Sequence, residues 1–234
     1  MKTENVFGGF VRLVDHMGDQ LSIVRAARVS YDAEWREHGD ANDAKLLKYL
    51  IDNRHTSPFE AVTFTFEVMA PIFVFRQWHR HRTWSFNEVS ARYAELDMGY
   101  YVPSTDVIGK QHAKSKQARD LDAQLPEETK ALAQAAYKCS CSHSFEHYRG
   151  LLAMGVPREL ARCVLPVAAY SRMFATVDLH NLLHFLGLRL HSHAQYEIRL
   201  YAKAIARLIY PLFPVVMDHW FKATGIGDDL YRNS

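Results

Sequence analysis

The chain has 234 residues, of which 28 are lysine or arginine and 26 are acidic, so its formal charge is +2. Apolar residues make up 48% and charged residues 23%, the proportions of an ordinary folded protein, which argues against disorder, collagen-like structure and coiled coil. We therefore expect a soluble cytoplasmic protein with one domain over residues 1–234.

The uncharged stretches of the chain are short. The longest, Leu179–Leu188 and Leu208–Met217, have ten residues each, against about 20 for a membrane-spanning helix. The N-terminal segment MKTENVFGGF lacks the apolar core of a signal peptide. The nearly neutral charge gives no general reason to expect nucleic acid or an anionic membrane. We expect neither as a partner.

The first third of the chain predicts strands and helices in alternation. Side chains from Val62 to Val68 alternate between apolar and polar, the period of a half-buried strand. Pro71 is expected to open a helix through about Arg82, since proline is tolerated in the first helical turn. The other expected elements are a strand over 7–14 and helices over 19–28 and 44–53.

The rest of the chain is mainly helical. Residues 94–125 look irregular, and a long helix is expected from Pro126 to near Gly155. A short helix (157–164), a strand (168–177), a helix (178–190) and an amphipathic helix whose apolar face runs from Ala194 to Ile209 follow. The fold class expected is α+β: a helix-rich single domain around a small, mostly antiparallel or mixed sheet.

The most unusual segment is RQWHRHRTWSFNEVSARY, residues 76–93. Between Val68 and Ala94 the single acid is Glu88, against four arginines. Arg76 and Arg80 lie four apart on the expected helix, a like-charge pair that an anion would relieve. Arginine rather than lysine indicates planar, bidentate binding of phosphate or carboxylate. From charge alone, a phosphate site and a solvated basic face are both open.

Two segments have the form of a capping box, in which Ser begins a helix and Glu reaches back to it. They are Ser85–Glu88, directly after the arginines, and Ser57–Glu60. Free amides at such a helix start bind anions. The first box therefore predicts a phosphate cradle, whereas the second is interpreted as an ordinary helix start.

Residues 80–92 read RHRTWSFNEVSAR. All seven fixed positions match RHRxxSxNxxSxR, the signature of flavin-dependent thymidylate synthases, and the chain resembles that family. The resemblance covers nearly the whole chain and leaves roughly residues 103–135 without a counterpart. It includes ARVSY (27–31), HTSPFE (55–60), APIFV (70–74), GVPRELAR (155–162), LR (188–189) and SHAQYEI (192–198).

The resemblance implies methylation of dUMP to dTMP. Methylenetetrahydrofolate (5,10-methylenetetrahydrofolate) would supply the carbon, FAD would relay the hydride, and NADPH would reduce the flavin. It also implies a homotetramer with sites shared between subunits. We expect no metal, since the histidine pairs lack a glutamate that could act as general base. Arg189 would lie at the uracil ring, where a fixed cation favours the N3-deprotonated, more nucleophilic pyrimidine.

The resemblance also assigns site residues. His55 resembles a family histidine near the folate and the flavin. Contacts to FAD fall to Ser57, Arg80, His81, Arg82, Glu88, Asp178, His180 and His184. Contacts to dUMP fall to Gln77, Arg80, Glu88, Val89, Ser90, Ala91, Arg92, Arg162 and Arg189.

The sequence departs from the family on the helix after Val177. Asp178, His180 and His184 stand where the family often has asparagine, arginine and a later asparagine. An aspartate lacks an amide donor and would repel a pyrophosphate, whereas histidine keeps a ring that can donate or stack. Ala61 stands where a common form of the motif has histidine, so the contacts to folate are expected to differ.

Two other classes of protein stay open. A metalloenzyme could use His180 and His184, four apart on a helix, with His191 and His193 close behind. It lacks the glutamate that would act as general base between the first pair. A non-catalytic nucleic-acid module could stack bases on Trp78, Trp84 and Phe86.

The cysteines bear on the mechanism. Cys139, Cys141 and Cys163 form neither a disulfide framework nor a zinc site of known spacing. Cys163 follows Arg162 but precedes Val164 and Leu165, and is expected to be a buried, inert thiol. We therefore expect no covalent enzyme nucleophile.

Overall fold

The computed structural model describes residues 2–30 and 40–226. Its centre is an antiparallel five-stranded sheet with the strand order β1-β2-β3-β7-β4, and a two-stranded hairpin, β5-β6, stands apart from it. The strands are β1 (Thr3–Val6), β2 (Gly9–Met17), β3 (Thr63–Pro71), β4 (Ser85–Glu88), β5 (Gly109–Gln111), β6 (Arg119–Gln124) and β7 (Tyr170–Asp178).

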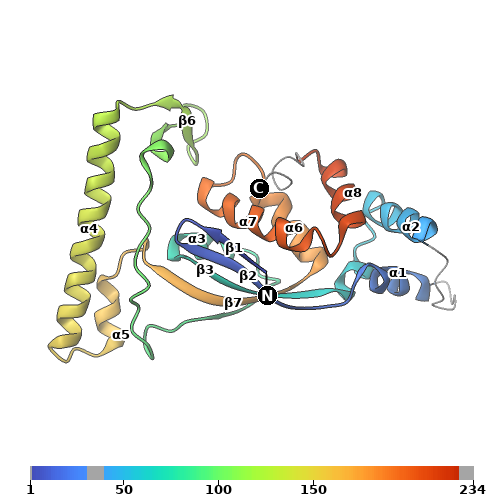
Figure 1. Cartoon of the computed structure of the whole chain (residues 1–234), viewed down its shortest axis with the longest axis horizontal. Helices are drawn as coiled ribbons and strands as arrows, with labels where there is room; N and C mark the ends of the chain where they lie inside the picture. Colours follow the sequence, from blue (N-terminus) through green and yellow to red (C-terminus); the bar gives the residue numbers. More distant parts are fainter. Residues whose placement is uncertain (1, 31–39, 227–234) are drawn as a thin grey trace.

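Helices cover the sheet on the side that carries the core (Figure 1). Among them, α6 and α7 pack on each other, α7 contacts β1 and β2, and α8 contacts α2. The helices are α1 (Gln20–Val29), α2 (Asp40–Asp52), α3 (Ile72–Trp78), α4 (Glu127–Ala153), α5 (Arg158–Ala161), α6 (Leu179–Arg189), α7 (Tyr196–Ile209) and α8 (Pro214–Thr224), with short 3₁₀ turns at Ser57–Ala61, Thr105–Val107 and Arg162–Val164. The expected α+β class is confirmed.

The two clearest periodic patterns are confirmed. In β3, Phe64, Phe66 and Val68 are fully buried, as the alternation predicts. In α7, the expected apolar face is buried at Ile198, with Tyr201, Ile205 and Ile209 on the same side. These two faces form much of the core between sheet and helices.

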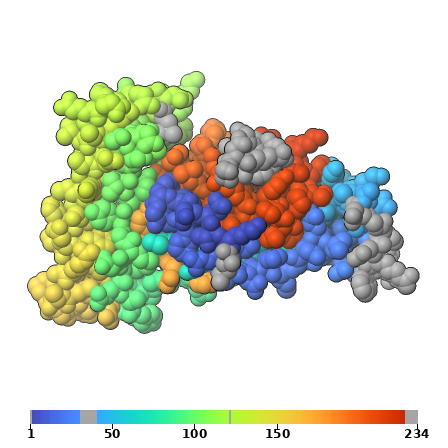
Figure 2. All heavy atoms as spheres, viewed as in Figure 1, coloured from blue at the N-terminus to red at the C-terminus, as the bar shows by residue number. Residues whose placement is uncertain are grey.

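Helix α4 lies away from this core. Figure 1 shows it as a separate upright element, with β6 near one end and α5 near the other. Of its 27 residues, four are buried: Lys130, Cys141, Phe145 and Tyr148. The space-filling view shows the segment around α4 forming one end of the molecule (Figure 2). Most of the surface of this helix therefore faces away from the protomer.

The expected capping boxes are wrong. Ser85–Glu88 is strand β4, paired with β7 in register Ser85↔Thr176 to Glu88↔Met173. Phe86, between exposed Ser85 and Asn87, packs on Trp84 at a ring-centroid distance of 6.1 Å. Sheet pairing therefore wins over the local helix signal. At Ser57–Ala61 a 3₁₀ turn forms, and no side-chain hydrogen bond caps it.

Helix α3 ends at Trp78 and not near Arg82. Trp78 and Trp84 are both buried and meet edge to face at 5.7 Å. In a continued helix, residue 84 would point about 240° away from residue 78, since each residue turns about 100°. The chain therefore turns after α3, and Arg76 and Arg80 do not share a helix face.

Several boundaries also differ from expectation. The strand expected over 7–14 is β2, which begins at Gly9 because Phe7 and Gly8 form a turn with φ of 32° and 86°, and β1 before it was not expected. The segment 94–125 contains the hairpin β5-β6, and α8 was not expected. Tyr31, part of one motif, lies outside the described residues. Among those that are described, none of the helices combines the length and apolar character that a bilayer span requires.

Candidate functional site

A cavity of about 590 Å³ opens between the turn after α3 and the first turns and end of α6. We call it the arginine cavity. Its walls carry three arginines and three histidines but no acid. The lining residues are Arg80, His81, Arg82, Thr83, His180, Asn181, His184, Leu188 and Arg189.

Arg189 is held by two neutral acceptors in this cavity. Its Nε donates to His81 Nε2 at 2.9 Å, and its Nη2 donates to the backbone oxygen of Gln77 at 3.0 Å. Burial, with smaller contributions from Arg189 and His184, lowers the pKa of His81 from 6.5 to about 4. His81 is therefore neutral at pH 7, and its Nε2 lone pair can accept from the guanidinium. The plane of Arg189 is fixed without loss of its charge.

A second cavity, of about 500 Å³, lies next to the first. Both share His180, His184 and Leu188. We call this second cavity, which includes His55 and Thr56, the His55 cavity. Apart from the shared residues its walls are mostly apolar, with Phe59, Leu183 and Trp220 among them. Ser57 follows Thr56 as an exposed residue at the start of the 3₁₀ turn. The two cavities therefore adjoin along α6, and we call the pair the cleft; one side of it is charged and the other apolar, which suits a long ligand with two such ends.

A third cavity, of about 400 Å³, contains Ser90, and we call it the Ser90 cavity. Glu88, Val89, Ala91 and Arg162 line it as well. Glu88 accepts a hydrogen bond from the Ser171 hydroxyl at 2.7 Å, and Ser90 Oγ accepts from the backbone N–H of Arg92 at 3.3 Å. Arg92 pairs with Glu159 at 3.7 Å on the exposed surface next to it.

Cys163 lies in the wall of the Ser90 cavity and is exposed. The expected burial of this thiol is therefore wrong. Because Arg162–Val164 forms a 3₁₀ turn at the surface, the apolar side chains of Val164 and Leu165 do not draw Cys163 inward. Burial instead affects Cys141, and it raises the pKa of that thiol.

The structure thus separates the sequence-predicted residues into two groups within one protomer. One group lines the two adjoining cavities of the cleft: His55, Arg80, His81, Arg82, His180, His184 and Arg189. The group from Glu88 to Ala91, with Arg162, surrounds the Ser90 cavity. Gln77 lines neither, although its backbone oxygen holds Arg189.

Asp178 is the N-cap of α6. Its carboxylate accepts from Asn181 N at 2.9 Å and from Asn181 Nδ2 at 2.6 Å. The aspartate that departs from the family pattern therefore serves the helix start, and this interaction stabilises the helix. Asn181, which the sequence analysis did not single out, lines the arginine cavity.

The four histidines considered for a metal site do not come together in one cluster; they lie in separate contacts. His184 faces His81 with ring centroids 6.1 Å apart, and His191 lies 4.7 Å from His193. In residues 2–30 and 40–226, no group of three or more histidine, cysteine or acidic side chains is placed to hold a metal ion.

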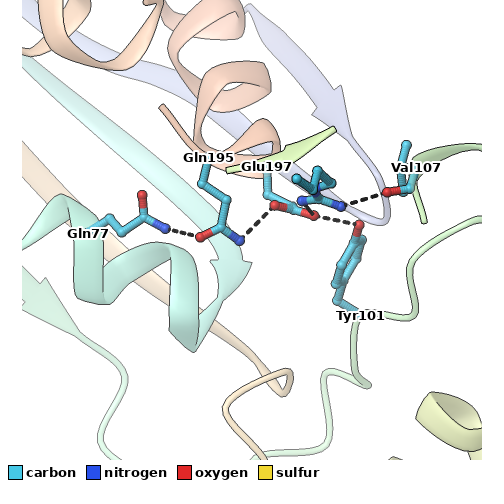
Figure 3. Close-up of polar contacts among 6 residues, drawn as sticks. Gln77, Tyr101, Val107, Gln195 and Glu197 are labelled. Atoms are coloured by element: carbon cyan, nitrogen blue, oxygen red, sulfur yellow. Dashed lines mark hydrogen bonds and ion pairs between the residues drawn. The ribbon is translucent and has the colours of Figure 1, made fainter. Parts of the chain in front are cut away.

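A polar chain that the sequence analysis missed runs from Gln77 to Glu197 and lies beside a fourth cavity, of about 510 Å³. Gln77 Nε2 donates to Gln195 Oε1, and Gln195 Nε2 donates to Glu197 Oε2 at 2.8 Å (Figure 3). Glu197 is 2% exposed and also pairs with Arg119 and Tyr101. The motif at 192–198 contained the signal, but its partners lie some 80 to 120 residues earlier in the chain.

Comparison with known proteins gives consistent matches. The family model described as thymidylate synthase complementing protein matches residues 12–215. The flavin-dependent thymidylate synthase of Thermus thermophilus is 49% identical over 207 residues, which cover 88% of this chain and 73% of the relative. That of Thermotoga neapolitana is 42% identical over 228 residues, covering 97% and 98%. A crystal structure of a UMP/dUMP methylase, PolB from Streptomyces cacaoi, bound with 5-Br UMP, superposes with a TM-score of 0.82 at 37% identity, covering 93% of this chain and 95% of that one.

Proposed function

Because the chain belongs to the flavin-dependent thymidylate synthase family and is an enzyme of thymidylate biosynthesis, we propose that it methylates dUMP to dTMP with FAD, NADPH and 5,10-methylenetetrahydrofolate. One observation carries the proposal: within the described part of the chain, Arg80, Arg82 and Arg189 share a cavity and none of them pairs with an acid. Unneutralised arginines are suited to phosphate groups.

The cleft has a donor set that fits FAD. Arg80, Arg82 and the ring of His180 offer N–H groups for a pyrophosphate, and the apolar walls of the His55 cavity offer surfaces for a flat ring system. When bound there, FAD supplies the hydride-relay chemistry. Ser57 and Glu88 complete the proposed contacts, whereas Asp178 contributes by holding the start of α6.

Arg189 is the proposed catalytic residue. Its guanidinium is anchored on one edge by His81 and Gln77, and this leaves other N–H groups for a ligand. A cation fixed beside the uracil ring stabilises negative charge at N3 and so makes C5 more nucleophilic. No cysteine is required for this activation. His55 lies at the far end of the cleft, where we propose that it contacts folate.

The Ser90 cavity is the proposed site for the dUMP phosphate. Arg162 and the backbone amides of Val89, Ser90 and Ala91 suit a dianion, and Arg92 lies beside them. Arg80 would contact the nucleotide from the arginine cavity, and Gln77 from its position beside Arg189 at the end of α3. These two groups of residues face different cavities within one protomer, so one nucleotide meets both where two subunits adjoin.

We therefore propose a single-domain protomer assembled as a homotetramer with shared sites. Helix α4 supports the proposal, since large apolar side chains on and near it are exposed: Leu132 at 65%, Met154 at 72% and Leu160 at 59%. Exposed apolar surface of this kind is typical of an interface. Closed symmetry would give each copy of the site the same partner surface.

The experiment is a reconstitution. Purified protein should be yellow, with flavin absorbance, and should form dTMP only when dUMP, methylenetetrahydrofolate and NADPH are all present. The matched control is Arg189→Ala, which should keep the fold and lose turnover. A colourless protein that copurifies with zinc or with RNA would refute the proposal in favour of a metalloenzyme or a nucleic-acid module.

The shared site has its own test. Arg189→Ala and Arg162→Ala proteins should each be nearly inactive. When they are refolded together in equal amounts, half of the dimeric units are mixed and each has one intact site of two, so about a quarter of wild-type activity should return. Mixing without subunit exchange should restore nothing. Confirmed mixed assemblies that stay inactive would place both arginines in a site within one chain.

A further inference from the structure

The polar chain from Gln77 to Glu197 has a fixed direction. Glu197 is 2% exposed, and its carboxylate pairs with Arg119 and accepts from the Tyr101 hydroxyl at 3.1 Å. Arg119 is held in turn by the backbone oxygen of Val107 at 2.9 Å. Burial and the neighbouring Glu197 raise the pKa of Tyr101, so its hydroxyl stays protonated and donates. An ionised carboxylate only accepts hydrogen bonds.

This anion decides the orientation of both glutamines. Because Glu197 only accepts, Gln195 must turn its NH₂ group toward it, and the Gln195 carbonyl then faces Gln77. Gln77 must therefore donate to that carbonyl with its own NH₂ group. The carbonyl oxygen of the Gln77 side chain is left over, and in the part of the chain that the structure describes it accepts no hydrogen bond. Figure 3 shows this oxygen pointing away from Gln195.

The free carbonyl lies on the residue that also anchors Arg189. The backbone oxygen of Gln77 accepts from Arg189 Nη2 at 3.0 Å, so the side chain of Gln77 starts next to the proposed catalytic residue. Gln77 is half-buried and Gln195 is exposed, so the polar chain leads from the buried carboxylate of Glu197 to the more accessible end of α3.

We propose that Glu197 is a positioning residue which, through Gln195, holds the Gln77 amide with its carbonyl toward the nucleotide as a hydrogen-bond acceptor. The proposal deepens, and rests on, the proposed function. When only its phosphate is ionised, dUMP offers two hydrogen-bond donors, the ring N3–H and the 3′-hydroxyl. A fixed acceptor selects one of them. Without the constraint from Glu197, the Gln77 amide could present either its NH₂ group or its carbonyl to the nucleotide. The buried carboxylate therefore adds specificity.

Glu197→Gln tests the direction of the chain. Arg119 still needs an acceptor, so the new amide would turn its carbonyl toward Arg119 and its NH₂ group toward Gln195. Gln195 would then invert, and Gln77 would present NH₂ in place of its carbonyl. Since a donor then meets a donor, dissociation constants for dUMP, measured by calorimetry on the FAD-loaded protein, should rise about 10- to 100-fold. FAD content should stay within twofold of wild type.

The matched control is Asp43→Asn. Asp43 is another buried acid, 6% exposed, paired with an arginine, Arg28, and it lines none of the four cavities. Its loss costs stability in the same way, but dUMP should bind within threefold of wild type. Gln195→Met is a second variant, at an exposed residue, and Glu197 keeps Arg119 and Tyr101 as partners when the Gln195 amide is lost. It leaves Gln77 free to rotate, and dUMP should bind about three- to tenfold more weakly.

A compensating pair separates positioning from general damage. In Glu197→Gln with Gln77→Glu, the inverted Gln195 offers its NH₂ group to the carboxylate introduced at position 77. The second oxygen of that carboxylate again accepts from the nucleotide. The double variant should bind dUMP more tightly than either single variant. Merely structural damage at Glu197 would not be repaired at residue 77.

Two analogues identify the donor that Gln77 recognises. Wild-type protein should lose affinity for either N3-methyl-dUMP or 2′,3′-dideoxyuridine monophosphate, and Glu197→Gln should not discriminate against that same analogue. The inference is overturned if Glu197→Gln binds dUMP as well as Asp43→Asn does, if the double variant is no better than the singles, or if both analogues bind like dUMP. Wild-type protein that binds no dUMP would overturn the proposed function as well.

Discussion

Arg189→Lys keeps the positive charge in the arginine cavity and removes the planar fork. The guanidinium makes two internal hydrogen bonds at once, to His81 Nε2 at 2.9 Å and to the Gln77 backbone oxygen at 3.0 Å. A lysine ammonium on a flexible stem cannot hold both and also face a ligand in the same plane. A hydrogen bond to a charged group contributes about 1.5–3 kcal/mol. Loss of one such contact in the transition state should therefore lower kcat/KM about 10- to 160-fold.

The assay compares three quantities in the same preparation. They are flavin absorbance per protomer, dUMP affinity, and the rate of dTMP formation. Arg189→Lys should keep FAD within about twofold, because Arg80 and Arg82 remain in the cavity. Arg82→Ala, the matched variant, should instead lose FAD. If both variants lose flavin equally, Arg189 acts as a cofactor ligand and the assignment of the uracil ring to it is refuted.

Three further predictions concern other parts of the structure. First, Gly9→Ala should lower the unfolding free energy by about 3 kcal/mol or more, roughly 6–12 °C in Tm, because its Cβ would lie 2.1 Å from the backbone oxygen of Met69. The control Gly150→Ala in α4, where a Cβ meets nothing within 4 Å, should be neutral or stabilising, and equal Tm values in calorimetry would contradict the packing argument. Second, the pKa of His81 is lowered from 6.5 to about 4, so between these pH values the native state binds fewer protons than the unfolded state, and stability should fall as the pH drops from 6.5 toward 4. His81→Gln should flatten this dependence, and a variant that keeps the wild-type slope would show that His81 titrates normally. Third, the variant with Cys139, Cys141 and Cys163 replaced by serine should still form dTMP, with some loss of stability from buried Cys141; a folded, FAD-loaded but inactive protein would reveal a covalent nucleophile.

The sequence predicted best where one pattern controlled both local structure and burial. The alternation from Val62 to Val68 and the apolar face of α7 need no knowledge of distant residues, because each pattern specifies which side faces the core. Pro126 likewise marks the start of α4. The signature at 80–92 brought together Arg80, His81 and Arg82, which line one cavity.

Prediction failed where long-range contacts overrode a local signal. The four residues from Ser85 to Glu88 satisfy a capping-box pattern, but β7, nearly 90 residues later, offers a strand edge, and Phe86 packs against Trp84. The network at Glu197 shows the same limit. Nothing near Glu197 in the sequence indicates that Tyr101 and Arg119 supply its hydrogen bonds.

The sequence has more arginines than acids between Val68 and Ala94, and part of this positive charge stays without an acid partner within the described part of the folded protein. Several arginines elsewhere on the described chain meet acids, as Arg119 meets Glu197 and Arg149 meets Asp97. In the arginine cavity the partners of Arg189 are neutral, because burial keeps His81 unprotonated.

Glu88, the acid nearest to the arginines in sequence, does not neutralise them. Its strand pairs with β7, and its carboxylate binds Ser171 and faces the Ser90 cavity instead. If Ser85–Glu88 had formed the expected helix start, this register with β7 would be lost, and the pairing would no longer direct the acid away from the arginines. The pairing of β4 with β7 therefore both overrides the local helix signal and places Glu88 at the Ser90 cavity, apart from the cavity of Arg80, Arg82 and Arg189.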